Sequence, residues 1–253
     1  MVSAVIVAAG SGTRMRAALR KQYLPLAGLP ILTRTLTVFE NCEQIDQICL
    51  VIPGEDFNFC RRNILMPAKF NTQIKLIAGG QSRQESVYNG LQKVEGRCSI
   101  VVIHDGVRPL IRNDQLVACI KGAGQTGACI LAVPAFDTLK QADASGRILS
   151  TLKRGNIWLA QTPQAFDLEL IKKAHEFARR EGYAGTDDAS LVEYLGAPVT
   201  IVTGSRSNIK ITSSEDLQIA QCLLREAMEE AAQDSQNIKK RRSPDAARRQ
   251  PPE

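Results

Sequence analysis

The sequence predicts an α/β protein with a Rossmann-like, mostly parallel twisted sheet, helices on both faces and an inserted β-hairpin arm. Short runs of β-branched and other apolar residues alternate along the chain with amphipathic segments of helical spacing. Most of these runs are apolar on both faces, as expected for strands that helices cover on either side. Regular alternation of this kind favours parallel strands joined by right-handed crossovers.

The expected elements follow from these patterns. Strands are expected at Val2–Val7, Gln47–Ile52, Ile74–Ile77, Ile100–Ile103, Cys129–Val133 and Val199–Val202. Helical spacing marks Ile31–Glu40, Asp56–Leu65, Arg83–Val94, Asp114–Gly122 and Leu168–Arg180. A last helix is expected from about Ser214 to Ala232, with a serine cap and two acids in its first turn.

The segment Asp137–Arg154 breaks the alternation. It is polar, has two stretches of alternating character, and contains a turn-like Asp-Ala-Ser-Gly at 143–146. This pattern predicts a β-hairpin inserted into the α/β core. Because a two-stranded hairpin is marginally stable by itself, we expect it to pack on another surface, such as a second subunit.

The net charge of +6 is concentrated at the C-terminal end of the chain. The segment 236–253 carries six Lys or Arg and two acids, a balance of +4, so the rest of the chain holds only +2. A nearly neutral body argues against nucleic acid as a partner. We expect one folded domain over residues 1–232 and a basic, disordered tail over residues 233–253.

Seven cysteines are scattered along the chain, and none forms a CxxC pair. An odd number of thiols and an N-terminus without a signal-peptide pattern predict reduced cysteines in a cytoplasmic protein. No apolar stretch has the length of a membrane span, so we expect no membrane partner. The two histidines show no ligand spacing to these thiols, so we expect no metal site built by the protein alone.

Candidate functional residues gather where three of the expected strands end. The first strand is followed by Ala8–Gly12, the third by Gly79–Ser82 and the fourth by His104–Gly106. In parallel sheets, ligands bind outside the carboxyl ends of the strands. All three segments should therefore open on the same edge of the sheet and form one site.

The first of these loops, AAGSGTRMRAALRK, matches neither common nucleotide fingerprint. A dinucleotide motif needs a third glycine where the chain has Arg14, and a Walker A loop needs a Gly-Lys-Ser/Thr that is absent. An ordinary strand-to-helix connection is the remaining structural alternative. Glycines that bring backbone amides close to phosphate oxygens, with Arg14 and Lys21 nearby, favour a triphosphate-binding loop.

Seven motifs in order give the chain a family resemblance over roughly Val2–Ala232. They are AAGSGTRM…KQYLPLAGLPIL, GGQSRQESVYNGL, HDGVRP, DTLK, TPQAF, TDDASLVEYLG and NIKIT. Together they resemble the 2-C-methyl-D-erythritol 4-phosphate cytidylyltransferases of the non-mevalonate isoprenoid pathway. The resemblance implies that residues 1–232 form a cytidylyltransferase domain, in which the arm at 137–154 serves dimerisation.

The resemblance also implies a reaction and its catalytic residues. A phosphate monoester oxygen attacks the α-phosphorus of CTP, CMP is transferred, and pyrophosphate leaves. The monoester is largely dianionic at neutral pH, so it needs no general base. Catalysis should consist of positioning and electrostatic stabilisation, helped by Mg²⁺ bound mainly through the CTP phosphates. The implied catalytic residues are Arg14, Lys21, Arg154 and Lys210.

The remaining site residues follow from the same motifs. The implied nucleotide-binding residues are Ala8, Ala9, Gly10, Gly12, Gly80, Gln81, Ser86 and Asp105, and the implied substrate-binding residues are Arg108, Thr138 and Thr186. In the family the arm reaches across a homodimer, so Thr138 and Arg154 would complete the partner's site.

The chain departs from the family pattern at several positions, and two other functions stay open. Arg20 stands where the family usually has proline, which suggests a floppier loop and an extra cation near phosphate. Ribitol 5-phosphate cytidylyltransferase is a relative with the same kind of loop, and the residues alone do not show which of the two polyol phosphates is the substrate. A non-catalytic nucleotide-binding module is the third reading, against which the cations for two separate phosphates argue.

Overall fold

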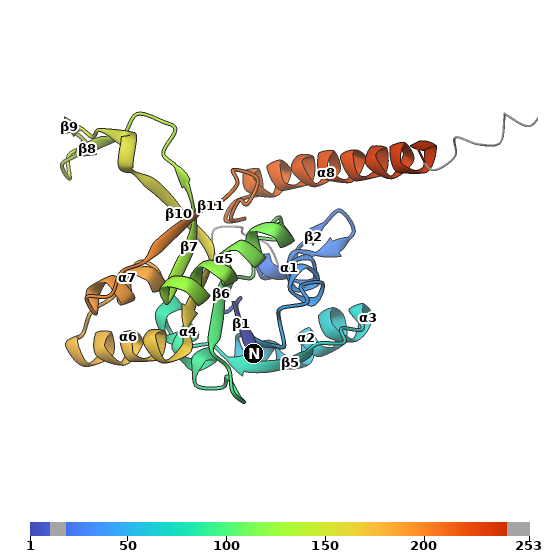
Figure 1. The fold of residues 1–253 in the computed structure, drawn as a ribbon, viewed down its shortest axis with the longest axis horizontal. Helices are drawn as coiled ribbons and strands as arrows, with labels where there is room; N and C mark the ends of the chain where they lie inside the picture. Colours follow the sequence, from blue (N-terminus) through green and yellow to red (C-terminus); the bar gives the residue numbers. More distant parts are fainter. Residues whose placement is uncertain (11–18, 242–253) are drawn as a thin grey trace, which may run out of the picture.

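A computed structural model describes residues 1–10 and 19–241 and shows a seven-stranded sheet at its centre (Figure 1). The strand order is β11-β7-β10-β6-β1-β4-β5. The strands are β1 (Val2–Val7), β4 (Gln47–Ile52), β5 (Gln73–Ala78), β6 (Ile100–Asp105), β7 (Ala128–Pro134), β10 (Trp158–Asp167) and β11 (Thr200–Thr203). All neighbours pair in parallel except β10, which runs antiparallel to both β6 and β7.

Helices cover both faces of this sheet, and the alternation of β1 shows how. Ala4 and Ile6 face a core shared with α1 (Ile31–Glu40), α5 (Asn113–Thr126) and the short helices of residues 57–68. Val5 points the other way, into a core shared with α4 (Arg83–Leu91), α6 (Leu168–Glu181) and α7 (Asp188–Tyr194). Strands that bury both faces must be apolar throughout, which explains the continuous apolar runs.

The predicted fold class is confirmed, and most expected elements lie within a few residues of their predicted bounds. The segment expected as a helix over 56–65 is divided into a 3₁₀ turn η3 (Gly54–Asp56), α2 (Phe57–Cys60), a π-helical turn η4 (Arg61–Leu65) and α3 (Met66–Ala68). The sequence pattern did not predict α7 or, more importantly, β10. The sequence of β10, WLAQTPQAFD, is polar at its centre and contains a proline there, which is atypical of a central strand.

The inserted arm is a two-stranded antiparallel sheet of β8 (Lys140–Ala142) and β9 (Ile148–Thr151), as the hairpin prediction requires. In Figure 1 it projects from the body beyond the ends of β7 and β10. Its apolar side chains are largely exposed: Ile148 is 60% and Leu149 is 58% accessible. The 3₁₀ turn η5 (Arg154–Asn156) leads from the arm into β10.

The last helix, α8 (Ser214–Arg241), extends beyond the expected end at Ala232. Its first turns lie over a small core in which Ala220 meets Leu26 and Ile31, while the rest projects from the body (Figure 1). The disordered tail was expected from residue 233, but residues 233–241 continue this helix, and residues 242–253 lie outside the described part of the chain. None of the described helices is both long and apolar enough to cross a membrane.

Candidate active site

The expected convergence of strand ends is present in the structure. The amide of Ala8 donates to Val51 O at 2.8 Å, and the amide of Gly106 donates to Val7 O at 2.9 Å. These ends enclose a cavity of about 450 Å³, which is lined by Val7, Ala8, Ala9, Gly10, Lys21, Gln22, Gly80, Gln81, Ser82, Arg83, Ser86, Asp105, Val107 and Lys210. We call this cavity the nucleotide compartment, after the ligand that the sequence predicts for it.

Two glycines let the strand ends approach this closely. A Cβ on Gly79 would lie 2.3 Å from Ala9 Cβ, and a Cβ on Gly106 would lie 2.8 Å from Ala8 Cβ. Both distances are well below van der Waals contact. The glycines therefore allow the loop after β1 to lie against its two neighbours, so that backbone rather than side chains lines this part of the cavity.

The N-terminus of α4 opens into the nucleotide compartment. Ser82 caps this helix by accepting a hydrogen bond from the amide of Glu85 at 3.0 Å. The hydroxyl of Ser86 accepts from the amide of Gly80 at 3.1 Å and donates to Ser82 O at 2.8 Å. Helix N-termini favour negative charge, so this end suits the phosphates or ribose of a nucleotide.

Asp105, at the end of β6, is the central charge of the site. Its Oδ1 lies 3.1 Å from Arg83 Nε, and its Oδ2 lies 2.9 Å from Lys210 Nζ and 3.6 Å from Arg108 Nε. Its amide donates to Thr162 Oγ1 at 3.1 Å. Burial by itself would raise the pKa of Asp105, but the charges of Arg83 and Lys210 outweigh it and hold the pKa far below its usual range.

A second cavity of about 250 Å³ lies on the other side of this charge cluster. It is lined by Arg83, Asp105, Arg108, Ala160, Gln161, Thr162, Gln164, Thr186, Asp187 and Lys210. We call it the acceptor compartment, after the polyol phosphate that the family resemblance implies as second substrate. The wall between the two compartments is formed by Arg83, Asp105 and Lys210, which line both. Gln161 and Thr162 reach it because the pairing of β10 with β7 shifts register between Ala160 and Gln164.

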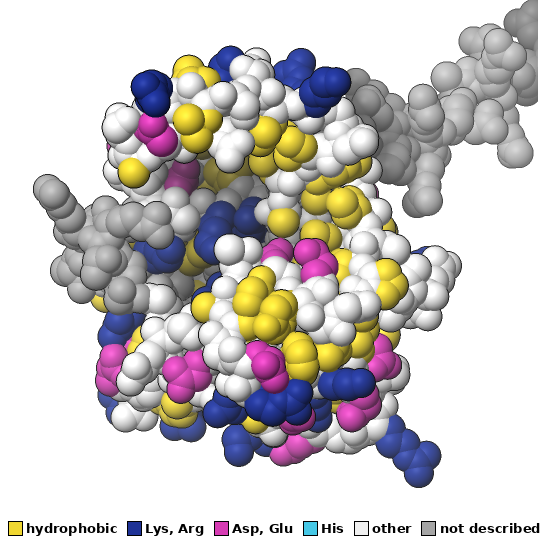
Figure 2. Space-filling model, turned by 90° about the vertical axis from the view of Figure 1, so that its left-hand side faces the viewer, with side chains coloured by type: hydrophobic (Ala, Val, Ile, Leu, Met, Phe, Trp, Pro, Cys, Tyr) yellow, Lys and Arg dark blue, Asp and Glu magenta, His cyan; other side chains and the backbone are white. Residues whose placement is uncertain are grey.

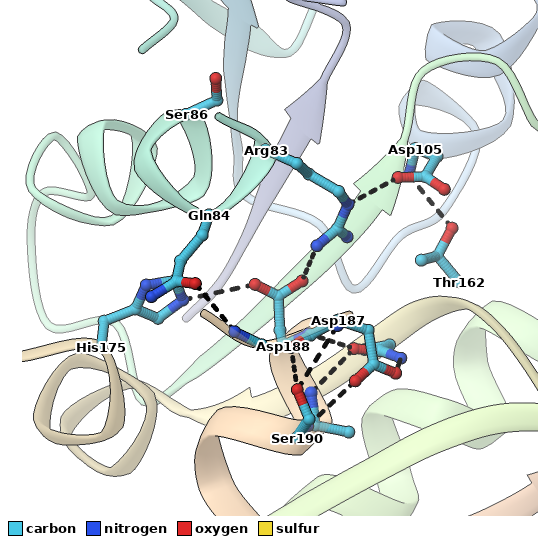
Figure 3. Close-up of polar contacts among 12 residues, drawn as sticks. Arg83, Gln84, Ser86, Asp105, Thr162, His175, Asp187, Asp188 and Ser190 are labelled. Atoms are coloured by element: carbon cyan, nitrogen blue, oxygen red, sulfur yellow. Dashed lines mark hydrogen bonds and ion pairs between the residues drawn. The ribbon is translucent and has the colours of Figure 1, made fainter. Parts of the chain in front are cut away.

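A buried network holds Arg83 from behind (Figure 3). Arg83 Nη1 lies 2.8 Å from Asp188 Oδ2, and the other oxygen of Asp188 lies 3.3 Å from His175 Nε2. Asp188 and His175 are both essentially inaccessible to solvent. Burial opposes ionisation of Asp188, but Arg83 and His175 keep its pKa below the usual value. Arg83 is thus fixed between Asp105, which lines both compartments, and Asp188, which lines neither.

The N-terminus of α7 fixes the backbone that carries Asp188. Asp187 and Ser190 form a reciprocal capping box there, as Figure 3 shows. The side chain of Gln164, from β10, donates to Asp187 Oδ2 at 2.7 Å and accepts from the amide of Asp188 at 3.2 Å. The missed strand β10 and the missed helix α7 therefore together support the wall between the compartments.

The structure brings together most of the residues that the sequence singled out. Nine line the nucleotide compartment: Ala8, Ala9, Gly10, Lys21, Gly80, Gln81, Ser86, Asp105 and Lys210. Arg108 and Thr186 line the acceptor compartment. Thr138 and Arg154 are exposed in the arm and line neither cavity, and the Arg154 guanidinium donates to Phe136 O. Gly12 and Arg14 lie outside the described residues.

Sequence reasoning missed Arg83, Gln164, His175 and Asp188. Arg83 directly follows the helix-capping serine in GGQSRQES, and Asp188 is the second acid of TDDAS. A paired acid beside a helix start was a usable signal, because one acid caps and the other is free to pair elsewhere. Nothing in the sequence indicated that His175 meets Asp188.

Among the described residues, no cluster of three or more His, Cys, Asp or Glu could hold a metal ion. Asp105 is the one carboxylate that lines both compartments in the described part of the chain, and it already faces three cations. Mg²⁺ in nucleotide sites is commonly held by one or two carboxylates together with substrate phosphates. The donor set here suits an ion that arrives with the triphosphate better than one held by the protein alone.

A Rossmann-like sheet with glycine-lined strand ends, a helix N-terminus and a cation-rich wall defines the chain as a nucleotidyltransferase. Figure 2 shows a hollow on one face of the molecule with Lys and Arg side chains gathered inside it. The family model described as 2-C-methyl-D-erythritol 4-phosphate cytidylyltransferase matches residues 2–226. The chain belongs to this family, as its seven motifs predicted.

Individual relatives agree with this assignment. The chain is 47% identical over 224 residues to the 2-C-methyl-D-erythritol 4-phosphate cytidylyltransferase of Syntrophus aciditrophicus, covering 88% of this chain and 96% of the relative. It is 46% identical to that of Caldanaerobacter subterraneus subsp. tengcongensis, covering 88% and 99%. The crystal structure of 4-diphosphocytidyl-2C-methyl-D-erythritol synthase from Anaerococcus prevotii superposes with a TM-score of 0.79 at 32% identity, covering 88% and 96%.

Stability should depend on pH through His104, which lies fully buried in β6 next to Asp105. Burial lowers the pKa of His104 to about 4, and its Nε2 donates to Arg108 O at 3.1 Å. Between pH 6.5 and 4, the unfolded chain binds a proton at His104 and the folded chain does not. The free energy of unfolding therefore decreases as the pH is lowered through this range. We expect a loss of about 2 kcal/mol from this group between pH 7 and pH 5.

Urea unfolding at both pH values checks this expectation. Glutamine can donate the same hydrogen bond without titrating, so the loss of stability between pH 7 and pH 5 should be smaller in His104→Gln than in the wild type. An equal loss in both proteins would contradict the assignment of this pH dependence to His104.

Proposed function

We propose that the chain transfers CMP from CTP to 2-C-methyl-D-erythritol 4-phosphate, releasing pyrophosphate and forming 4-diphosphocytidyl-2-C-methyl-D-erythritol. The observation that carries this proposal is the shared wall of Arg83, Asp105 and Lys210 between two compartments. One compartment would hold the nucleotide and the other the polyol phosphate. A wall that is cationic on both sides would let two anionic substrates meet.

The chemical step needs little from the protein beyond position and charge. A phosphate oxygen of the acceptor forms a bond to the α-phosphorus, and the bond between that phosphorus and the β-phosphate oxygen breaks. The electron pair leaves with pyrophosphate, and no proton has to be removed from the dianionic acceptor. Lys21 would stabilise the charge that develops on the transferred and departing phosphates, together with Arg14 from outside the described residues.

Lys210 and Arg108 would serve the acceptor. Lys210 lines both compartments and lies 2.9 Å from Asp105, so its ammonium group would face the acceptor phosphate from a fixed place. Arg108 is held from its other end, because its Nη1 donates to Asn208 O at 2.7 Å. Thr186 also lines this compartment, where its hydroxyl would contact the polyol. Mg²⁺, when bound with the triphosphate, would neutralise part of the phosphate charge.

The arm would complete the site of a second subunit. Thr138 and Arg154 project with the arm instead of lining the compartments of their own chain. The exposed apolar side chains of the arm support packing against another copy of the chain. Seven cysteines without a disulfide support a reducing compartment such as the cytoplasm.

The reaction can be tested directly by measuring pyrophosphate release from CTP and Mg²⁺ with two alternative acceptors. We expect turnover with 2-C-methyl-D-erythritol 4-phosphate and at least about tenfold lower kcat/KM with ribitol 5-phosphate, because specificity rests on polyol contacts in the acceptor compartment. Preference for ribitol 5-phosphate would reassign the substrate. Binding of CTP without turnover on either acceptor would favour a non-catalytic nucleotide-binding module.

Removing the ammonium group of Lys21 tests the catalytic assignment. Lys21→Ala should lower kcat about 10²-fold or more, the scale of losing one transition-state charge contact, while the thermal unfolding midpoint stays close to that of the wild type. Lys121→Ala is a matched control, since Lys121 is exposed on α5 outside both compartments. Wild-type turnover in Lys21→Ala would refute the role of Lys21.

A charge on the arm tests whether two chains share a site. Leu149 is 58% exposed in the single chain, so Leu149→Asp should leave the fold intact but weaken dimer association and reduce activity at low protein concentration. Sedimentation velocity and activity measured over the same dilution series give the readout, with Met66→Asp as control, since Met66 is also exposed (69%) and lies outside the arm. Full activity in a demonstrated monomer would reject the shared site.

A further inference from the structure

Lys21 begins a single 3₁₀ turn, Lys21–Tyr23 (η2), and its neighbours on both sides are anchored. Gln22 is 1% exposed and donates from Nε2 to Ala8 O at 2.8 Å, which ties it to the loop after β1. The hydroxyl of Tyr23 donates to Asp56 Oδ2 at 3.1 Å. These contacts fix the position of this short turn relative to the loop after β1 and to Asp56.

Arg20 supplies the anchor on the N-terminal side of Lys21. Its Nη2 lies 2.5 Å from Glu55 Oε1, and its Nε lies 2.9 Å from Asp56 Oδ2. The guanidinium thus spreads over two carboxylates, a geometry for which its planar fork is suited and a lysine is not. Arg20 was expected to be an extra cation near phosphate, whereas in the structure both of these nitrogens face acids.

The two carboxylates lie close to the carboxyl end of β4. They belong to the 3₁₀ turn η3, which directly follows β4. The amide of Asp56 donates to Pro53 O at 3.0 Å, and the amide of Gly79 donates to Ile52 O at 2.9 Å, so the turn continues the hydrogen-bonded edge of the sheet. A side chain that binds Glu55 and Asp56 is therefore held at the carboxyl end of β4.

Asp56 joins Arg20 to Tyr23 and closes the arrangement. The Tyr23 ring is 5% exposed and packs on Phe59, with ring centroids 4.8 Å apart. Burial and the nearby Asp56 raise the pKa of Tyr23, so the phenol keeps its proton and donates a hydrogen bond to this carboxylate. The amide of Tyr23 in turn donates to Arg20 O at 2.9 Å. Both residues that flank the Lys21–Gln22 pair thus meet on one carboxylate.

We propose that Arg20 is a positioning residue for the transfer reaction, which holds the backbone of Lys21 against the sheet edge through Glu55 and Asp56. This inference rests on the proposed role of Lys21. A lysine side chain has four rotatable bonds, so its ammonium group reaches a defined point only when its backbone is fixed. The Arg20 contacts supply that restraint on the N-terminal side of the turn.

A partly exposed ion pair contributes little to global stability, so loss of Arg20 should act on the reaction more than on the fold. In Arg20→Ala, kcat should fall about tenfold, because small misplacements of catalytic groups cost up to about 10²-fold, while KM for CTP changes less than about twofold. Hydrogen exchange at the amides of Tyr23 and Leu24, which bond to Arg20 O and Lys21 O, should become faster.

Neutralising Glu55 and Asp56, the partners of Arg20, should have the same effect on kcat as removing the Arg20 side chain. Glu55→Gln with Asp56→Asn should reproduce the lower kcat, and combining them with Arg20→Ala should lower it no further. Arg112→Ala is a matched control, because it breaks an Arg–Asp pair with Asp114 in which both side chains are exposed. Its kcat and the exchange of the Tyr23 and Leu24 amides should equal those of the wild type.

Three outcomes would overturn the inference. Wild-type kcat in Arg20→Ala, with Lys21→Ala inactive, would show that Lys21 needs no such restraint. A raised KM for CTP at unchanged kcat would show instead that Arg20 contacts the nucleotide. Additive losses in the combined variant would show that Arg20 and the acids act separately. Full activity in Lys21→Ala would be a different failure, because it would remove the proposed role of Lys21 whatever Arg20 does.

Discussion

The meeting of one carboxylate with three cations is the interaction on which the rest of the site depends. Asp105 lies at the end of β6 with Arg83, Arg108 and Lys210 around it. Without the carboxylate, three like charges would face one another in a partly buried space, and without the cations a buried carboxylate would be strongly disfavoured. Each of these side chains therefore fixes the others, and together they form the wall that both compartments share.

This wall needs support from behind, because a long arginine side chain does not hold its own position. Arg83 is held between Asp105 and the buried Asp188, which also meets His175. Buried ion pairs of this kind contribute little net stability compared with an apolar core, but losing one partner leaves an uncompensated charge. The network is therefore better understood as specifying where Arg83 lies than as a source of folding free energy.

The sequence predicted the elements that follow the regular alternation of strands and helices, and it did not predict the elements that interrupt this alternation. Apolar runs buried on both faces identified the parallel strands, and the strand-end rule located Gly80 and Asp105 in one site. The antiparallel strand β10 was missed because its central segment turns polar side chains toward the acceptor compartment, which removes the apolar pattern of a core strand. His175 was missed because its contact with Asp188 joins two helices, and no local spacing encodes such a contact.

The charge balance of the site fits the proposed reaction, in which the dianionic acceptor needs no general base. Among the described residues, Asp105, Asp187 and Asp188 offset three of the four cations of the site, which leaves a small excess of positive charge; these cations are Lys21, Arg83, Arg108 and Lys210. Such an excess would attract the triphosphate and the phosphate monoester, and the anions would in turn relieve the repulsion among the cations. In the proposed reaction, a protein arranged in this way would bring two anions together and stabilise the charge that moves between them. The acceptor would supply its own nucleophile, so this reaction calls for fixed cations rather than a general base.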